Sequence, residues 1–271
     1  MNAAPLVSIV IPAHNEEKAL ARLLDSILCQ TYEPLQIILV DDGSTDGTLA
    51  IARSYAEKDP RLTVLTQPCS GVSAARNRAL PLCTGKYIRF ADSDDTLPPD
   101  SVALLVRRAE ADGTGLVISG YTAYIGDLGR YKNLAKREDT IPVHQALKHI
   151  SRFSNSYFYG VLWNKLYLRE LVGDLRFDEM VFWGEDFAFN MSYLKKAETI
   201  AYMKEPVYDY RRNPTSATFR QVLDCVLHPM NNIRIKIRLY RALKDLYVSR
   251  GEYETYRKTL WLYLFRAGMD L

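Results

Sequence analysis

Two aspartates close to the end of an apolar run are the most chemically suggestive residues in the chain. The segment FADSDDT places Asp92 and Asp94 two positions apart. Side chains with this spacing point the same way on an extended backbone, so the two carboxylates should face one point. Crowded carboxylates repel one another, and hard oxygen ligands suit Mg²⁺ or Mn²⁺. The spacing therefore predicts a divalent-cation site, with a polar turn before two prolines as the alternative.

A second acidic segment, VDDGSTDG, follows another apolar run. Asp41 and Asp42 should lie at its carboxyl end, where a carboxylate can accept hydrogen bonds from a base or a ribose. The same residues could instead form a tight turn and a helix cap, with Ser44 as the capping residue. A calcium-binding EF-hand loop is excluded, because the twelfth position counted from Asp42 is Arg53 and not Glu.

Basic residues enter a helix after the turn CSG. In CSGVSAARNRAL, Arg76 and Arg78 fall in the early turns of the predicted helix. A helix N-terminus with arginine side chains suits a diphosphate. We expect Arg76 to serve such a site and Arg78 to be solvated.

A third group of acids and aromatic residues lies in the second half. Glu185 and Asp186 begin a helical pattern after Gly184 and could simply complement the positive helix N-terminus. Trp163 and Trp183 precede them. Aromatic faces can cover the apolar side of a sugar ring, although such residues more often belong to the core.

The elements that must position these residues alternate along the first half. Short β-branched runs occur at residues 7–11, 36–40, 62–65, 87–91 and 116–119, and helical spacing of leucines lies between the first two. This alternation predicts an α/β fold with a mostly parallel sheet flanked by helices. Ligands gather at the carboxyl ends of the strands in such sheets.

The alternation of strands and helices ends near Asp112, which indicates that the second half builds a different surface. We predict one domain over residues 1–220, with a nucleotide-binding half (1–120) and an acceptor half (121–220), followed by a helical extension over 221–271. In the segment YDYRRNPTSAT, Arg211, Arg212 and Ser216 could form a closing loop over a diphosphate. The extension is basic and aromatic, so it could contact an anionic membrane surface or form a homo-oligomer interface.

Composition excludes several classes of protein. The chain has 271 residues and a formal net charge of +3, which implies no extended nucleic-acid surface. Its four cysteines form no C-x-x-C pair, which argues against a zinc framework and disulfides and favours a reducing compartment. The first apolar run lacks the basic flank of a signal peptide, and no apolar stretch reaches the roughly 18 residues of a membrane span. We therefore expect a cytoplasmic protein, and peripheral contact with the inner face of the cell membrane stays open.

Taken together, four ordered motifs carry a family resemblance. They are P-x-x-N at 12–15, VDDGSTD at 40–46, S-x-x-R-N at 73–77 and DSDD at 92–95, with a later GED at 184–186. They resemble family 2 glycosyltransferases of GT-A fold, which invert the anomeric centre. The resemblance is strong over residues 5–120 and weaker to about residue 215. The WNK triplet at 163–165 resembles transferases of the bacterial capsule, lipopolysaccharide and exopolysaccharide type.

The resemblance implies a donor, a metal and an acceptor. It implies a UDP-type nucleotide sugar near Pro12, Ala13 and Glu16, together with Asp41, Asp42, Arg76 and Asp92, and Mn²⁺ or Mg²⁺ on Asp94 and Asp92. It implies Asp186 as the catalytic base, with Glu185 as second choice. A saccharide or lipid-linked saccharide acceptor would contact Trp183, Trp163 and Lys165. The polymerase motif Q-x-x-R-W is absent, which favours single addition.

Two other functions stay open from the residues alone. A sugar-phosphate nucleotidyltransferase shares the sheet architecture but ordinarily has a glycine-rich loop after the first strand, where this chain has PAHNEE. A Rossmann dinucleotide site is disfavoured because G-x-G-x-x-G is missing there. The other alternative is a catalytically inactive saccharide-binding module, in which the acidic residues would be replaceable.

Overall fold

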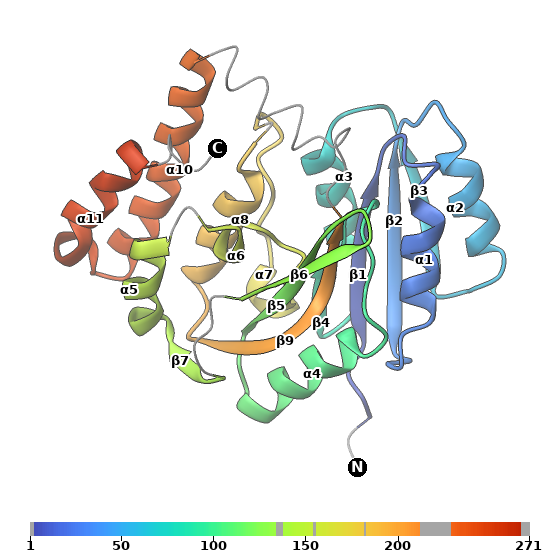
Figure 1. The fold of residues 1–271 in the computed structure, drawn as a ribbon, viewed down its shortest axis with the longest axis horizontal. Helices are drawn as coiled ribbons and strands as arrows, with labels where there is room; N and C mark the ends of the chain where they lie inside the picture. Colours follow the sequence, from blue (N-terminus) through green and yellow to red (C-terminus); the bar gives the residue numbers. More distant parts are fainter. Residues whose placement is uncertain (1–2, 134–137, 154–155, 182, 212–228, 267–271) are drawn as a thin grey trace.

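The computed structural model describes residues 3–133, 138–153, 156–181, 183–211 and 229–266. A single large sheet runs through the molecule, with helices on both of its faces and a pair of C-terminal helices at one end (Figure 1).

The first half supplies four parallel strands. They are adjacent in the order β3 (Leu62–Gln67), β2 (Leu35–Asp42), β1 (Val7–Ala13) and β4 (Tyr87–Phe90). The β1–β2 register pairs Ala13 with Asp41, so both strands end at the same level. Four of the five predicted β-branched runs therefore form the parallel strands that the sequence indicates, and the fifth, at 116–119, lies farther along the same sheet.

The second half extends the sheet with both strand directions. Its strands are β5 (Leu116–Ile125), β6 (Leu128–Lys132), β7 (Thr140–Pro142), β8 (Lys165–Leu168) and β9 (Thr199–Arg211). Strand β8 is antiparallel to both β4 and β5, and β9 is parallel to β5. Consequently β5 and β9 run in the direction of β4, and their carboxyl ends reach the same edge of the sheet.

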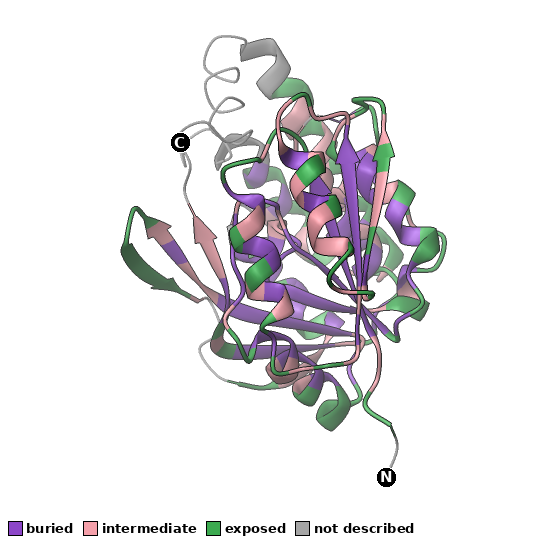
Figure 2. Cartoon of the chain, turned by 90° about the vertical axis from the view of Figure 1, so that its right-hand side faces the viewer, coloured by how far each residue is buried: buried purple, intermediate pink, exposed green. Residues whose placement is uncertain are grey.

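Helices α1 (Leu20–Leu28), α2 (Thr48–Ala56) and α4 (Ser101–Asp112) cover one face. The leucines with helical spacing, Leu20, Leu23 and Leu24, are buried there against the odd-numbered side chains of β1. Alternate side chains of the strand and leucines about 3.6 residues apart in the helix therefore pack into one shared core. Figure 2 shows the buried strands enclosed between partly exposed helices.

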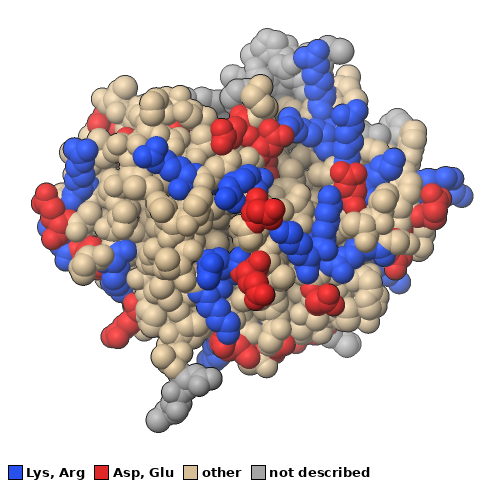
Figure 3. Space-filling model, turned by 180° about the vertical axis from the view of Figure 1, so that it is seen from behind, with Lys and Arg blue, Asp and Glu red and all other residues tan. Residues whose placement is uncertain are grey.

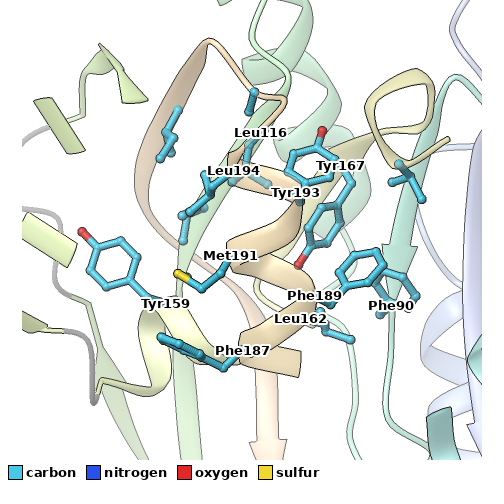
Figure 4. Close-up of a cluster of buried hydrophobic side chains, with 14 of the residues drawn as sticks. Phe90, Leu116, Tyr159, Leu162, Tyr167, Phe187, Phe189, Met191, Tyr193 and Leu194 are labelled. Carbon is cyan, nitrogen blue, oxygen red and sulfur yellow. The ribbon is translucent and has the colours of Figure 1, made fainter. Parts of the chain in front are cut away.

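The opposite face packs the remaining helices. They are α3 (Val72–Ala79), a 3₁₀ turn at Leu80–Leu82, α5 (Val143–Phe153), α6 (Tyr157–Gly160), α7 (Arg169–Val172), α8 (Glu185–Leu194), α10 (Pro229–Ser249) and α11 (Tyr253–Arg266). Helix α8 is central to this core, because its Phe187, Phe189 and Met191 lie among buried side chains of the sheet and neighbouring helices (Figure 4).

The C-terminal helices share that core. Leu243, Leu246 and Tyr247 of α10 are fully buried, and Tyr263 of α11 stacks on Phe187 of α8. The predicted boundary near residue 220 lies in 212–228, outside the described residues, as do Arg212 and Ser216 of the proposed closing loop. None of the described helices is both long enough and apolar enough to cross a bilayer. Seen from behind, basic and acidic side chains are interspersed over the surface (Figure 3).

Candidate active site

The acidic motifs of the first half meet at the shared carboxyl edge of the sheet. Asp41 lies one residue before the end of β2, beside Ala13 of β1, and Asp92 follows β4 by two positions. The amide of Ala91 donates to the carbonyl oxygen of Val10 at 3.1 Å, which continues the β1–β4 ladder up to the acidic segment. The fold therefore brings the two motifs to one edge, as the sequence predicts.

Asp41 is a buried carboxylate with unused hydrogen-bonding capacity. Its Oδ2 accepts a bond from the backbone N–H of Ser44 at 3.3 Å. Its Oδ1 is buried and has no hydrogen-bond partner among the described residues. A buried, unpartnered acceptor costs free energy, so this atom marks a place where a ligand N–H or O–H would be favourable.

Asp42 has a different environment although it is the next residue. Its Oδ1 accepts bonds from Gln67 Nε2 and the Ser70 N–H, and its Oδ2 accepts one from the Gly71 N–H, each at 2.8 Å. These bonds tie the end of β2 to the loop that enters α3. Since its carboxylate holds this loop, we do not place Asp42 in the donor site.

The loop after β1 is interlocked with the loop after β2. Pro12 and Ala13 are buried at the end of β1, and Asn15 adopts a positive φ of 56°. The side chain of Asn15 accepts a bond from the Thr45 N–H at 2.8 Å, and the N–H of Glu16 donates to Thr48 Oγ1 at 2.7 Å. These bonds hold the two loops in place on either side of Asp41.

Arg76 is the centre of a buried ionic network. Its guanidinium Nη1 lies 2.6 Å from Asp186 Oδ1 and 3.2 Å from Glu185 Oε1, and its Nη2 lies 3.2 Å from Asp92 Oδ1. Only 4% of the Arg76 side chain is exposed, and the guanidinium carbon stands 5.3 Å from the ring centroid of Phe177. One arginine therefore joins carboxylates from two distant segments.

The protonation of these groups reflects burial and mutual repulsion. Burial raises the pKa of Asp186 well above its ordinary value; Arg76 opposes this shift, whereas Glu185 and Asp92 add to it. Burial likewise raises the pKa of Asp92, again against the effect of Arg76. The Arg76 guanidinium itself has a raised pKa despite its burial, because the three carboxylates surround it. Arg76 therefore stays protonated, whereas burial favours the protonated forms of Asp92 and Asp186.

Asp94 stands outside that network. Burial and the nearby charge of Asp92 raise the pKa of Asp94 to about 6. The structure records no ion pair for its carboxylate within the described ranges, although Arg22 Nη2 donates to its backbone carbonyl at 2.9 Å. Two partly buried carboxylates without full charge compensation fit a divalent cation, and oxygen donors suit Mg²⁺ or Mn²⁺.

Strand β9 holds the acidic segment in place. The buried Asp95 accepts a bond from the Arg211 N–H at 2.7 Å, and the Asp92 N–H donates to Tyr208 Oη at 3.0 Å. Thr96 forms a β-bridge with Asp209. Sequence reasoning missed these supports, because β9 lies more than 110 positions away and its polar residues form no motif.

The second acidic pair begins α8 in a constrained position. Gly184 caps the helix with a φ of +82°, and a Cβ there would lie 2.5 Å from Leu239 Cδ2 of α10. Only glycine satisfies both the left-handed backbone and this close approach without strain. Glu185 and Asp186 are therefore aimed at Arg76 by the packing of α8 against α10.

Two of the predicted acceptor residues lie in the interior. Lys165 is 1% exposed, and its Nζ donates to the Phe158 carbonyl at 2.9 Å and to Asn164 Oδ1 at 2.8 Å. Trp163 is 3% exposed and stacks on Tyr208 with ring centroids 4.5 Å apart. Side chains this deep cannot touch an acceptor, so the expectation for Lys165 and Trp163 is corrected. The residue types alone do not predict how deeply these two side chains are buried.

Trp183 differs from these two, because it is partly exposed immediately before Gly184 and the acids of α8. Arg78 is exposed, as expected for a solvated arginine. The edge of the sheet therefore gathers Asp41, Arg76, Asp92 and Asp94 with the Glu185–Asp186 pair, while Asp42, Trp163 and Lys165 support the structure around it.

Comparisons with known proteins identify related sequences. Residues 8–196 match the family model described as glycosyl transferase family 2. The chain is 35% identical over 245 residues to the uncharacterized glycosyltransferase EpsJ of Bacillus subtilis, covering 87% of this chain and 70% of that protein. It is 30% identical over 260 residues to the cholesterol galactosyltransferase of Borreliella burgdorferi, covering 89% and 71%.

Solved structures share the fold. S. aureus TarS 1–349 in complex with UDP superposes with a TM-score of 0.74 at 20% identity, covering 96% of this chain and 71% of that one. The mannosyltransferase PcManGT of Pyrobaculum calidifontis, in complex with GDP-Man and Mn²⁺, gives a TM-score of 0.61 at 19% identity and covers 99% and 87%. The family model and the glycosyltransferase relatives favour glycosyl transfer over nucleotidyl transfer or an inactive module. The chain belongs to glycosyl transferase family 2 and is a GT-A glycosyltransferase.

Proposed function

We propose that this enzyme transfers a sugar, with inversion, from a UDP-sugar to a saccharide or lipid-linked saccharide acceptor in the synthesis of a cell-surface polysaccharide. The observation that carries the proposal is the network in which Arg76 joins Asp92 to Glu185 and Asp186. It unites the candidate donor edge of the sheet with a candidate base from the second half.

The donor site is supported by the environment of Asp41. Its buried Oδ1 has no partner among the described residues, and the walls formed by Pro12, Ala13 and Glu16 stand beside it. A uracil N–H or a ribose hydroxyl would satisfy that oxygen. A UDP complex of TarS, which has the same fold, supports the choice of nucleotide.

Asp94 and Asp92 are the residues that we propose hold Mn²⁺ or Mg²⁺. Their partly uncompensated negative charge supports this assignment, as does the Mn²⁺ in the structure of PcManGT. When bound, such a cation would neutralise charge on the leaving diphosphate. Asp95 and Tyr208 would keep the two carboxylates in position.

Asp186 is the proposed general base. Its carboxylate would accept the proton of the acceptor hydroxyl while that oxygen forms a bond to the anomeric carbon and the bond to the diphosphate oxygen breaks. Arg76 at 2.6 Å would keep the ionised carboxylate oriented and offset its burial. Glu185, which shares Nη1 of the same arginine, is the second candidate.

The acceptor is proposed to approach past Trp183, the partly exposed aromatic residue next to this pair. A lipid-linked acceptor would be met at the cytoplasmic face of a membrane. Exposed Trp261 and Leu262 on α11, close in sequence to Arg257 and Lys258, support peripheral contact there, and the same helix could instead pair two copies of the chain.

UDP release from a panel of UDP-sugars, with saccharide acceptors and Mn²⁺, tests the proposal. Wild-type protein should release UDP from at least one donor, and Asp186→Asn should lower the rate at least 100-fold while UDP affinity is kept. The matched control is Asp178→Asn, a half-exposed acid in an ion pair with Arg238. Equal rates for Asp186→Asn and wild type would contradict the assignment of the base.

A further inference from the structure

A cluster of three different metal-ligating side chains lies apart from Asp92 and Asp94. His14 follows β1, Asp42 ends β2, and Cys69 belongs to the loop between β3 and α3. One ligand atom from each residue lies within 4.8 Å of the others. The cluster therefore brings imidazole, carboxylate and thiol groups together from three loops.

The three loops are held against one another by contacts that need no metal. The Asp42 carboxylate fastens the Cys69 loop through the N–H groups of Ser70 and Gly71. Gly43 has a φ of +69°, and a Cβ on it would lie 2.6 Å from the backbone nitrogen of Cys69. The backbone of Cys69 is thus seated directly against the end of β2, which limits how far the thiol can move away.

One hydrogen bond of His14 orients its ring for metal binding. Its Nδ1 lies 2.7 Å from the carbonyl oxygen of Asp42, and a carbonyl only accepts, so Nδ1 carries the proton. Nε2 then carries the ring lone pair, which accepts a hydrogen bond from the side-chain amide of Asn15 at 3.1 Å, and a bound ion would take the place of that amide. A backbone carbonyl bound to one ring nitrogen is the usual way in which a metal-ligating histidine is oriented.

The donor set selects a class of cation. Thiolate and imidazole prefer borderline-soft ions such as Zn²⁺ to Mg²⁺ or Mn²⁺. Tetrahedral Zn²⁺ places its ligand atoms about 3.5 Å apart, so shifts of about 1 Å by His14 and Cys69 would close the cluster. Both side chains are exposed, which gives the ion access and leaves the fourth position to water.

We propose that His14, Asp42 and Cys69 form a second metal site that binds one Zn²⁺-like cation. The bound ion would cross-link the loops that follow β1, β2 and β3, which frame Asp41. The site is separate from the proposed diphosphate-binding metal and does not depend on the transferase chemistry.

Titration of Co²⁺ into the metal-free protein tests this site, because a cobalt–thiolate bond gives a near-ultraviolet charge-transfer band. Wild-type protein should show the band at one equivalent. Zn²⁺ should remove it, whereas Mg²⁺ should not. Cys69→Ser should abolish the band, and His14→Ala should weaken Co²⁺ binding at least tenfold. Cys29→Ser is the matched control, since Cys29 is an exposed thiol elsewhere on the chain, and it should keep the band.

The proposal is overturned if wild-type protein shows no thiolate band, if the band persists in Cys69→Ser, or if His14→Ala binds Co²⁺ as tightly as wild type. Thermal unfolding in EDTA should be the same for Cys69→Ser and wild type, which separates loss of the ligand from loss of the fold. UDP binding with Mg²⁺ should persist in Cys69→Ser, so this test and that of the donor site are independent.

Discussion

The guanidinium of Arg76 lies 2.6 Å from the carboxylate of Asp186, although 110 positions separate the two residues. This contact joins the two halves of the chain at the proposed reaction centre. It links α3, which enters from the parallel sheet, to α8, which is anchored in the core of the second half (Figure 4).

Removing that arginine should destabilise the protein. Arg76→Ala leaves Asp92, Glu185 and Asp186 without their common cation, and breaking a buried ion pair from one side costs about 3 to 5 kcal/mol. Urea unfolding at pH 7 measures the loss. Arg78→Ala, an exposed arginine in the same helix, is the control and should change the free energy of unfolding by less than about 0.5 kcal/mol. Equal losses in the two variants would contradict the network.

Asp94 should make stability depend on pH when no metal is bound. Its folded-state pKa of about 6 exceeds the ordinary value of 3.8, so ionisation disfavours the folded state. The penalty is small near pH 4, grows as pH rises towards 6, and is complete above that. In EDTA, Asp94→Asn should therefore be more stable than wild type at pH 7.5, by up to about 3 kcal/mol.

The same comparison near pH 4 should show almost no difference between Asp94→Asn and wild type. Urea midpoints at the two pH values provide the measurement. A stability difference that does not change with pH would show that the Asp94 carboxyl has an ordinary pKa. With Mn²⁺ the order at pH 7.5 should reverse, because only wild type gains stability from the cation.

Much of this site follows from the sequence, and the reason is physical. β-branched runs fix the strands, and parallel strands bring their carboxyl ends to one edge, so the positions of Asp41 and Asp92 could be predicted. The pairing of Arg76 could not, because an arginine in the first turns of a helix has the same local pattern whether it faces a diphosphate or a distant carboxylate. Lys165 was misassigned for a related reason, since its burial depends on packing between segments.

Asp41 and Asp42 should have separable roles. Asp41→Asn should weaken UDP binding at least tenfold with little change in stability, because its Oδ1 has no partner to lose among the described residues. Asp42→Asn should instead lower stability by about 2 to 3 kcal/mol, because the amide NH₂ that replaces one carboxylate oxygen cannot accept the bonds that this oxygen receives from Gln67, Ser70 or Gly71. Calorimetry and thermal unfolding of both variants supply the data, and the opposite pattern would show that the two roles are exchanged.

Gly184 should be intolerant of a side chain. Gly184→Ala introduces a Cβ 2.5 Å from Leu239 at a φ of +82° and should cost more than Gly251→Ala, where φ is +69° and no atom lies within 4 Å. The left-handed backbone alone accounts for about 1 to 2 kcal/mol in both variants. The excess in Gly184→Ala should shrink when Leu239→Ala is added. Unfolding free energies of this double-mutant cycle measure the contact, and additive effects would show that α8 and α10 do not meet there.

Calorimetric titration of UDP tests the central claim that Asp94 and Asp92 bind a metal and nucleotide together. With Mn²⁺, wild-type protein should bind UDP, and either EDTA or Asp94→Ala should weaken the affinity at least tenfold, whereas Asp186→Asn should leave it nearly unchanged. Absence of UDP binding, or UDP binding that is insensitive both to EDTA and to Asp94→Ala, would contradict the account.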